Sequence, residues 1–128
     1  MGTNVLLPEN AIPLIRGTSK TLKLTVVDLD NKPIDLTGAT VHFTVKLEPF
    51  DRNPVIKKSS QNIAEAEISS PPQDGIARIF LDPADTQDLE CRLYVFDVWV
   101  ILQSGKRYCV VKQSTLELLP GITVLPLP

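Results

Sequence analysis

The sequence predicts an all-β fold, an antiparallel β-sandwich with extended N- and C-terminal arms. Several short segments alternate apolar and polar residues, turn-forming residues separate them, and almost none has the apolar period of a helix. The 11 prolines gather near both ends and in the joints between these segments. A chain of 128 residues is long enough to bury one core. We therefore expect one sandwich over residues 16–119, with an N-terminal arm at 1–15 and a C-terminal tail at 120–128.

Each predicted strand has a period of two, as in a sheet that buries one face. Leu22, Leu24 and Val26 fall on one such face, and a second set of apolar residues follows Thr40. Residues 47–74 are broken by prolines, and we expect at most short strands at 55–57 and 65–68, without a predicted register. Asp82 followed by Pro83 is typical of the start of one helical turn. The clearest strands are expected at 20–27, 39–46, 76–81, 91–102 and 106–112.

The last two strands predict a β-hairpin closed by the two-residue loop Ser104-Gly105. Counting from that loop, both faces of the hairpin are apolar, whereas a sheet that packs on one side only is polar on the other. We therefore expect the second face to be covered, either by the chain's own N-terminal arm or by a partner. The predicted pairs are Val98–Val111, Val100–Cys109, Trp99–Val110, Ile101–Tyr108 and Asp97–Lys112.

The tail at 120–128 is apolar and rich in proline, although tails that lie free in solvent are usually polar. This composition favours a segment that adds to a sheet edge or groove, in the same chain or in a neighbour. Aromatic side chains, which are enriched in interface cores, mark the second hairpin face as the other candidate interface. The candidate interface residues are Trp99, Ile101, Tyr108, Val110, Ile122, Val124, Leu125 and Leu127.

Composition argues against several functions. The formal net charge of −2 does not suit a nucleic-acid binder that depends on neutralising phosphates. One histidine, His42, which we expect on a strand surface, and two distant cysteines leave no pattern for a metal or cofactor. In the predicted register Cys91 and Cys109 lie on opposite faces, so we expect no disulfide and a core position for Cys109. We expect no enzymatic activity, no secretory signal and no membrane span.

Several turn motifs carry a family resemblance. D-L-T-G-A at 35–39 and D-P-A-D-T at 82–86 stand among segments that resemble the immunoglobulin-like N-terminal domain of baseplate upper proteins from tailed phages. The resemblance covers roughly residues 14–118 and implies an immunoglobulin-like sandwich, built into a virion by docking of subunits, with no catalytic residues. The segments that carry it are 14–28, 33–43, 74–79, 81–86, 93–98 and 104–108.

We therefore expect a structural subunit of a tailed-phage virion, in the baseplate, tail, neck or capsid surface, made in the bacterial cytoplasm. Its expected partners are other virion proteins and further copies of itself in a ring or lattice. The alternative is a carbohydrate-binding module that recognises host surface glycans. Trp99 and Tyr108 would then form the aromatic platform on which such modules place a sugar.

Overall fold

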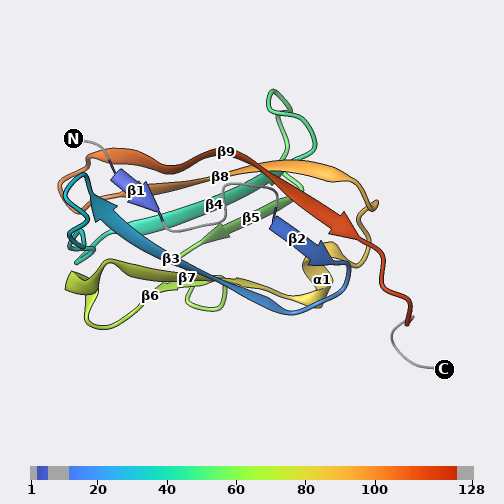
Figure 1. Ribbon diagram of the computed structural model, residues 1–128, viewed down its shortest axis with the longest axis horizontal. Coiled ribbons are helices and arrows are strands. Elements are labelled where there is room, and N and C mark those ends of the chain that lie inside the picture. The colour runs from blue at the N-terminus through green and yellow to red at the C-terminus, as the bar shows by residue number, and fades with distance from the viewer. Residues whose placement is uncertain (1–2, 6–11, 124–128) are drawn as a thin grey trace.

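The computed structural model describes residues 3–5 and 12–123, which form two β-sheets packed face to face (Figure 1). The first sheet has the strand order β1 (Thr3–Val5), β3 (Lys20–Asp28), β7 (Ile76–Leu81) and β6 (Ala66–Ile68). The second has the order β2 (Ile12–Ile15), β9 (Arg107–Leu119), β8 (Leu93–Ile101), β4 (Thr40–Lys46) and β5 (Ile56–Ser59). A 3-10 turn (Pro72–Asp74) and the short helix α1 (Pro83–Thr86) complete the elements. Within these described residues, no helix is both long and apolar enough to cross a membrane.

The order of the strands follows the immunoglobulin topology. If the strands are lettered A, A′, B, C, C′, D, E, F and G along the chain, the sheets read A-B-E-D and A′-G-F-C-C′. Neighbouring strands are antiparallel except for β2 and β9, which run parallel. The segment predicted as an N-terminal arm thus supplies a strand to each sheet: β1 pairs with β3, and β2 pairs with β9. The predicted immunoglobulin-like sandwich is confirmed.

A tyrosine corner fixes the start of β8. The Tyr94 hydroxyl donates a hydrogen bond of 2.6 Å to the carbonyl oxygen of Glu90, four residues upstream. In antibody domains such a tyrosine stands two residues before the second core cysteine, a position that Phe96 occupies here. The Phe96 ring packs against Phe43 of β4 with the ring centres 5.6 Å apart. An aromatic pair therefore fills the centre of the sandwich.

The core lies between the sheets and contains the apolar residues predicted to point inward. Leu22, Leu24 and Val26 of β3 are buried, as are Val41, Phe43 and Val45 of β4. Alternating residues of β4, including His42, lie half-buried on the other face of their sheet, as predicted. The two short strands proposed between residues 47 and 74 are also present, as β5 and β6.

Helix α1 begins at Pro83 as predicted, and it ties the two sheets together. The Asp82 amide donates to Asp85 Oδ2 at 2.7 Å, so the first turn is capped by its own side chains. Asp85 Oδ2 also lies 2.8 Å from Nζ of Lys58, a buried lysine of β5. Thr86 is fully buried, and its hydroxyl accepts a hydrogen bond from the Gly17 amide at 2.8 Å. The helix thus connects β5 to the turn between β2 and β3.

The predicted register of the β8–β9 hairpin is wrong except at one pair. The loop has three residues, because the Leu102 amide donates to the Lys106 carbonyl and the Gly105 amide donates to the Leu102 carbonyl, each at 2.8 Å. Gly105 has φ 91°, which is typical of a three-residue loop that ends in a left-handed residue. The extra loop residue shifts the pairing at the tip by one position relative to the two-residue prediction.

Two irregularities in the ladder lie on either side of Val98. The one between Trp99 and Val98 restores the predicted register at Val98, and the one between Val98 and Phe96 shifts the register by one further position. Val98 pairs with Val111, as predicted, but Trp99 pairs with Cys109, Val100 with Tyr108, and Ile101 with Arg107. Asp97 does not face Lys112. Because the strand bulges, the neighbours Val110 and Val111 are both buried, whereas strict alternation would have put one of the two outside. Cys109, predicted in the core, is exposed instead.

Candidate functional site

The most distinctive surface lies on the outer face of the five-stranded sheet, along β8. The side chains of this strand that point away from the core form a line that we call the β8 track. Leu93 and Trp99 are 57% and 41% exposed, and the other three members are half-buried. Four of the five are apolar, and Asp97 is the only charged one. The β8 track consists of Leu93, Val95, Asp97, Trp99 and Ile101.

Polar side chains flank the β8 track on both neighbouring strands. On β4, Lys46 lies opposite Val95, Thr44 opposite Asp97, and His42 opposite Trp99. On β9, Glu117 lies opposite Leu93 and Thr115 opposite Val95. The track is therefore an apolar strip one strand wide between two polar borders. Such a strip suits an extended ligand better than a broad, flat partner surface.

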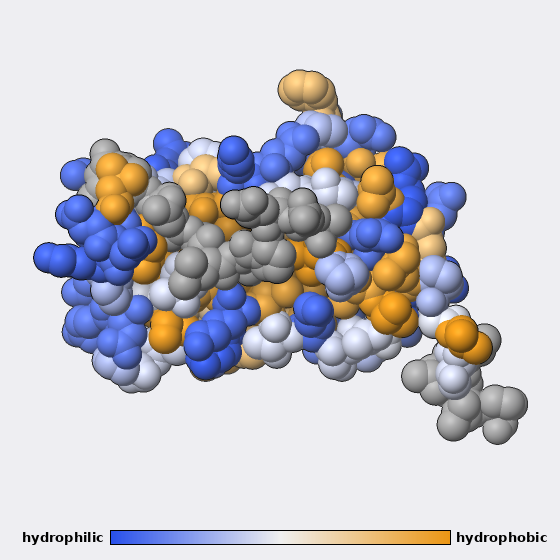
Figure 2. Space-filling view, in the orientation of Figure 1, coloured by the Kyte–Doolittle hydropathy of each residue, from blue (hydrophilic) through white to orange (hydrophobic). Residues whose placement is uncertain are grey.

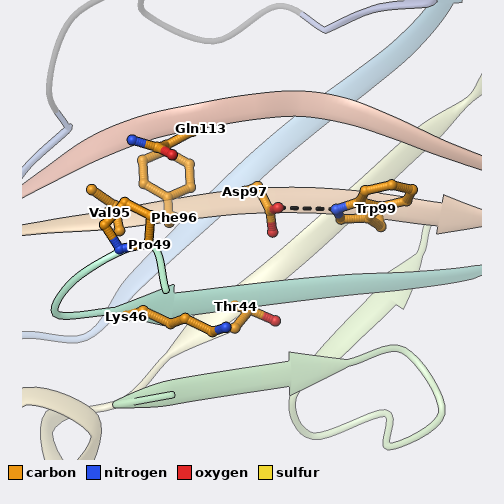
Figure 3. A pocket seen from close by; sticks show the side chains of 8 residues that line it. All are labelled: Thr44, Lys46, Pro49, Val95, Phe96, Asp97, Trp99 and Gln113. Atoms are coloured by element: carbon orange, nitrogen blue, oxygen red, sulfur yellow. Dashed lines mark hydrogen bonds between the residues drawn. The ribbon is translucent and has the colours of Figure 1, made fainter. Parts of the chain in front are cut away.

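The middle of the β8 track is hollowed. A depression of about 250 Å³ lies between Val95 and Trp99, and it is bordered by Thr44, Lys46 and Pro49 on one side and by Gln113 on the other. Figure 3 shows the indole of Trp99 at one end of the depression and Val95 with Pro49 at the other. A second depression, of about 420 Å³, lies on the other sheet beside Ile63 and Phe80.

Asp97 positions the indole. The Trp99 Nε1–H donates a hydrogen bond of 2.9 Å to Asp97 Oδ2, so the ring is held against the strand although much of it is exposed (Figure 3). Asp97 also acts on Cys109, the residue paired with Trp99. Burial first, and then the negative charge of Asp97, raises the pKa of the Cys109 thiol above its ordinary value. The shift lowers the fraction of nucleophilic thiolate that Cys109 carries at a given pH.

The titratable side chains at the border of the β8 track include His42, which lies opposite Trp99. Within residues 3–5 and 12–123, no group of three or more His, Cys, Asp or Glu side chains is placed to hold a metal ion. His42 Nε2 lies 3.2 Å from the Thr40 hydroxyl, but no carboxylate among the described residues hydrogen-bonds the ring to orient it as a base. Both cysteines are free thiols. What the face offers is an exposed aromatic ring, apolar side chains and polar borders.

The structure separates the predicted interface residues into three groups. Trp99 and Ile101 lie on the β8 track, as expected. Tyr108 and Val110 do not belong to that face: Val110 is buried, and Tyr108 packs partly buried against the core. The prediction that the outer face carries all four residues is wrong, because it rested on the two-residue loop.

The remaining predicted residues lie in the C-terminal tail. Ile122 is fully exposed, at the end of the chain that runs away from the sandwich after β9 (Figure 1). In Figure 2 this protruding end carries a hydrophobic residue, shown in orange. Val124, Leu125 and Leu127 lie outside the described residues.

The sequence interpretation did not single out Leu93, Val95, Lys46, Pro49 or Gln113. The signal for the first two was available, because every second residue from Leu93 to Ile101 must share the face of Trp99 once that strand is recognised. Gln113 had no such signal. Its place at the depression depends on the bulged pairing between β8 and β9.

Solved structures with the same fold were found at low sequence identity. CopC from Methylosinus trichosporium OB3b is 12% identical, with a TM-score of 0.52 over 96% of this chain and 99% of that protein. The Lin-41 filamin domain is 12% identical (TM-score 0.48; 93% of each chain), and so is the RIG-5 IG1 homodimer (TM-score 0.47; 95% of this chain and 100% of that one). No protein-family model and no curated protein sequence matches the chain. Its strand order and its tyrosine corner give one conclusion, that the chain is an immunoglobulin-like β-sandwich.

Proposed function

We propose that the chain is a structural subunit that acts by protein–protein docking, without catalysis. The observation that carries the proposal is the β8 track, where Leu93 is 57% and Trp99 is 41% exposed on a sheet face in water. Exposed apolar side chains in a row are a mark of interaction surfaces. The fully exposed Ile122 adds a second apolar element at the C-terminal end.

The fully paired interior supports the same proposal. Among the described residues, no buried side-chain nitrogen or oxygen lacks a hydrogen-bond partner. Active sites commonly hold strained or incompletely paired polar groups, whereas a scaffold satisfies them. The sandwich therefore serves as a rigid support that presents the β8 track and the C-terminal tail to neighbours.

The setting that we propose is the virion of a tailed phage, in its baseplate, tail, neck or capsid surface. Support for this setting comes from the turn motifs at 35–39 and 82–86 and the segments around them, which resemble virion domains of the same fold. In this proposal the chain is made in the bacterial cytoplasm and is incorporated into particles next to other virion proteins and further copies of itself.

Deletion of residues 121–128 tests the proposal directly. The shortened chain should fold, because these residues follow the last strand, but its incorporation into particles should fall at least several-fold. Mass spectrometry of purified virions measures the copy number per particle. A second variant replaces Ile122, Val124, Leu125 and Leu127 by serine. It keeps the length of the tail and removes its apolar side chains, so its incorporation should fall as well. Normal incorporation of both variants would contradict a docking role for the tail.

A second candidate function is glycan binding, and the depression beside Trp99 is the observation that favours it. Sugars stack on exposed aromatic rings, and Asp97, Gln113 and Lys46 provide polar groups around this one. A glycan array with the isolated domain separates the two functions. Saturable binding of a sugar that is lost in Trp99→Ala favours the module, whereas no binding favours docking.

A further inference from the structure

We propose that the C-terminal segment of one copy, residues 120–128, binds along the β8 track of a second copy. The proposal rests on the docking function above and names both halves of one contact. The donor is an apolar, proline-containing tail. The acceptor is the strip centred on Trp99.

The donor half is suited to reaching a neighbour. After Leu119 the described chain leaves the sandwich (Figure 1). The Ile122 side chain is fully exposed. The segment 120–128 contains three prolines, at 120, 126 and 128. Proline restricts the backbone to an extended conformation before binding, so that less entropy is lost when the segment docks.

The acceptor half has the chemistry that an extended proline-containing segment requires. Such segments dock on grooves lined by aromatic rings, and their backbone carbonyls, which have no partner within the segment, accept hydrogen bonds from the groove. Trp99, Val95 and Pro49 provide the apolar lining of the depression. Lys46 and Gln113 stand at its borders with nitrogen donors for the carbonyls (Figure 3).

The direction of β9 argues that the tail reaches another copy instead of its own. Gln113 lies at the depression, and the strand then runs six more residues away from it, about 20 Å at the usual rise of a strand. The chain continues away from the sandwich after Leu119. A return to its own track would need a complete reversal of the chain within the first residues of the tail.

The sheet edges are poor alternatives to the track. On β5 the Ser59 amide already donates to Glu65 Oε1 at 3.0 Å, so the edge is partly capped by the following loop. On β2 the Arg16 amide donates to Leu119 of β9, and by alternation the nitrogen of Pro13 points to the free edge, where it has no hydrogen to donate. The strand pairing that these two edges, both of the five-stranded sheet, could offer is therefore limited.

Because donor and acceptor are different parts of the chain, the contact is heterologous: each copy supplies one tail and one track. Repetition of such a contact forms a closed ring or an open chain of copies. Blocking the acceptor in one variant and the donor in another should therefore give two variants that bind only each other.

Sedimentation velocity on the full chain tests this inference. The wild-type chain should associate as its concentration rises. Trp99→Ala and the double substitution Ile122→Asp with Leu125→Asp should each weaken self-association at least tenfold. A mixture of these two variants should form one-to-one dimers and nothing larger. Lys23→Ala, on the exposed outer side of β3, is the matched control and should associate like the wild type.

A chain that stays monomeric at every concentration, or a tail variant that associates like the wild type, overturns the inference. A mixture of the Trp99 variant and the tail variant that forms no dimer also overturns the inference. None of these results decides the proposed function, because the incorporation of the tail deletion into virions is measured separately.

Cysteine crosslinking provides a second, independent readout. Cys109 lies beside Trp99 on the outer face and is exposed. In a Cys91→Ser background, Leu125→Cys should form a disulfide with Cys109 of another copy after mild oxidation, giving a ladder of multimers on a non-reducing gel. Lys23→Cys in place of Leu125→Cys is the matched control and should give no ladder. Equal crosslinking of the two variants would contradict the placement of the tail.

Discussion

The two sides of β8 differ sharply although they belong to one strand. Tyr94, Phe96, Val98 and Val100 point into the sandwich, and each is at most 4% exposed. On the other side, Leu93 is 57% and Trp99 is 41% exposed. Both sides are largely apolar, but only the outer one includes a carboxylate, Asp97.

The contrast shows that hydrophobic character alone does not identify a core. The inner side is covered by the second sheet, and its contribution is to stability. The outer side has polar borders and a hydrogen-bonded indole, and within the described chain no second sheet packs on it. Substitutions on the inner side should therefore change the free energy of unfolding, whereas those on the outer side should change binding.

The largest effect is expected for Phe96→Ala. This substitution removes a buried ring packed on Phe43, so it should lower the free energy of unfolding by about 3–5 kcal/mol. The matched substitution Trp99→Ala, on the other side of the strand, should cost about 1 kcal/mol or less. Urea unfolding followed by circular dichroism measures both, since Trp99 is the only tryptophan and cannot serve as the probe. Equal losses of unfolding free energy for Phe96→Ala and Trp99→Ala would contradict the difference between the inner and outer sides of β8.

A smaller loss is expected for Tyr94→Phe, which deletes only the hydroxyl of the tyrosine corner. The hydrogen bond to the Glu90 carbonyl should be worth about 1 kcal/mol. Tyr108→Phe is the matched control, because that side chain is only partly buried. Both free energies of unfolding come from the same urea titrations, and a loss for Tyr108→Phe as large as for Tyr94→Phe would contradict the role of the corner.

The same tyrosine should make stability depend on alkaline pH. Burial, the largest cause, raises the pKa of Tyr94 above its ordinary value of 10.0, so the folded state holds this proton more tightly than the unfolded state. Its contribution is complete below pH 10 and is lost as the pH rises from 10 through the folded pKa. The melting temperature of the wild type should therefore fall above pH 10 more steeply than that of Tyr94→Phe. If the melting temperatures of the two proteins fell equally with pH, Tyr94 would have the same pKa in the folded and unfolded states, which contradicts this prediction.

On the outer side, Asp97→Asn should leave stability within about 0.5 kcal/mol of the wild type, because this carboxylate is partly exposed. The substitution should instead change the reactivity of the Cys109 thiol. Loss of the negative charge lets the pKa of Cys109 fall, although burial, the larger cause, keeps part of the rise. In a Cys91→Ser background, Cys109 should react faster with a thiol reagent near pH 8. An unchanged rate would mean that Asp97 does not act on this thiol.

Much of the fold could be predicted because its signals are local. β3, β4 and β7 alternate apolar and polar residues and end at turn residues, so their bounds and buried faces followed from the sequence. The same holds for α1, where Asp82 and Pro83 mark the start. The parallel pairing of β2 with β9 joins residues more than a hundred positions apart and leaves no local pattern.

The outer face was predicted only in part, for a physical reason. Ser104-Gly105 is compatible with a loop of two or of three residues, and the choice moves every pair at the tip by one position. The bulge beside Val98 then leaves the neighbours Val110 and Val111 both buried, which alternation cannot reveal. Trp99 kept its predicted side because it lies on β8, the regular strand, whereas Tyr108 and Val110 belong to the bulged one.

The fluorescence emission of Trp99 is the sharpest test of docking on the β8 track, because this indole, from the single tryptophan of the sequence, lies at the centre of the proposed surface. In the wild-type chain, emission should shift to shorter wavelength and quenching by acrylamide should weaken as protein concentration rises. A chain that lacks residues 120–128 should show neither change until a peptide of those residues is added. An indole that stays equally quenchable at all concentrations, with and without the peptide, would contradict docking on the β8 track.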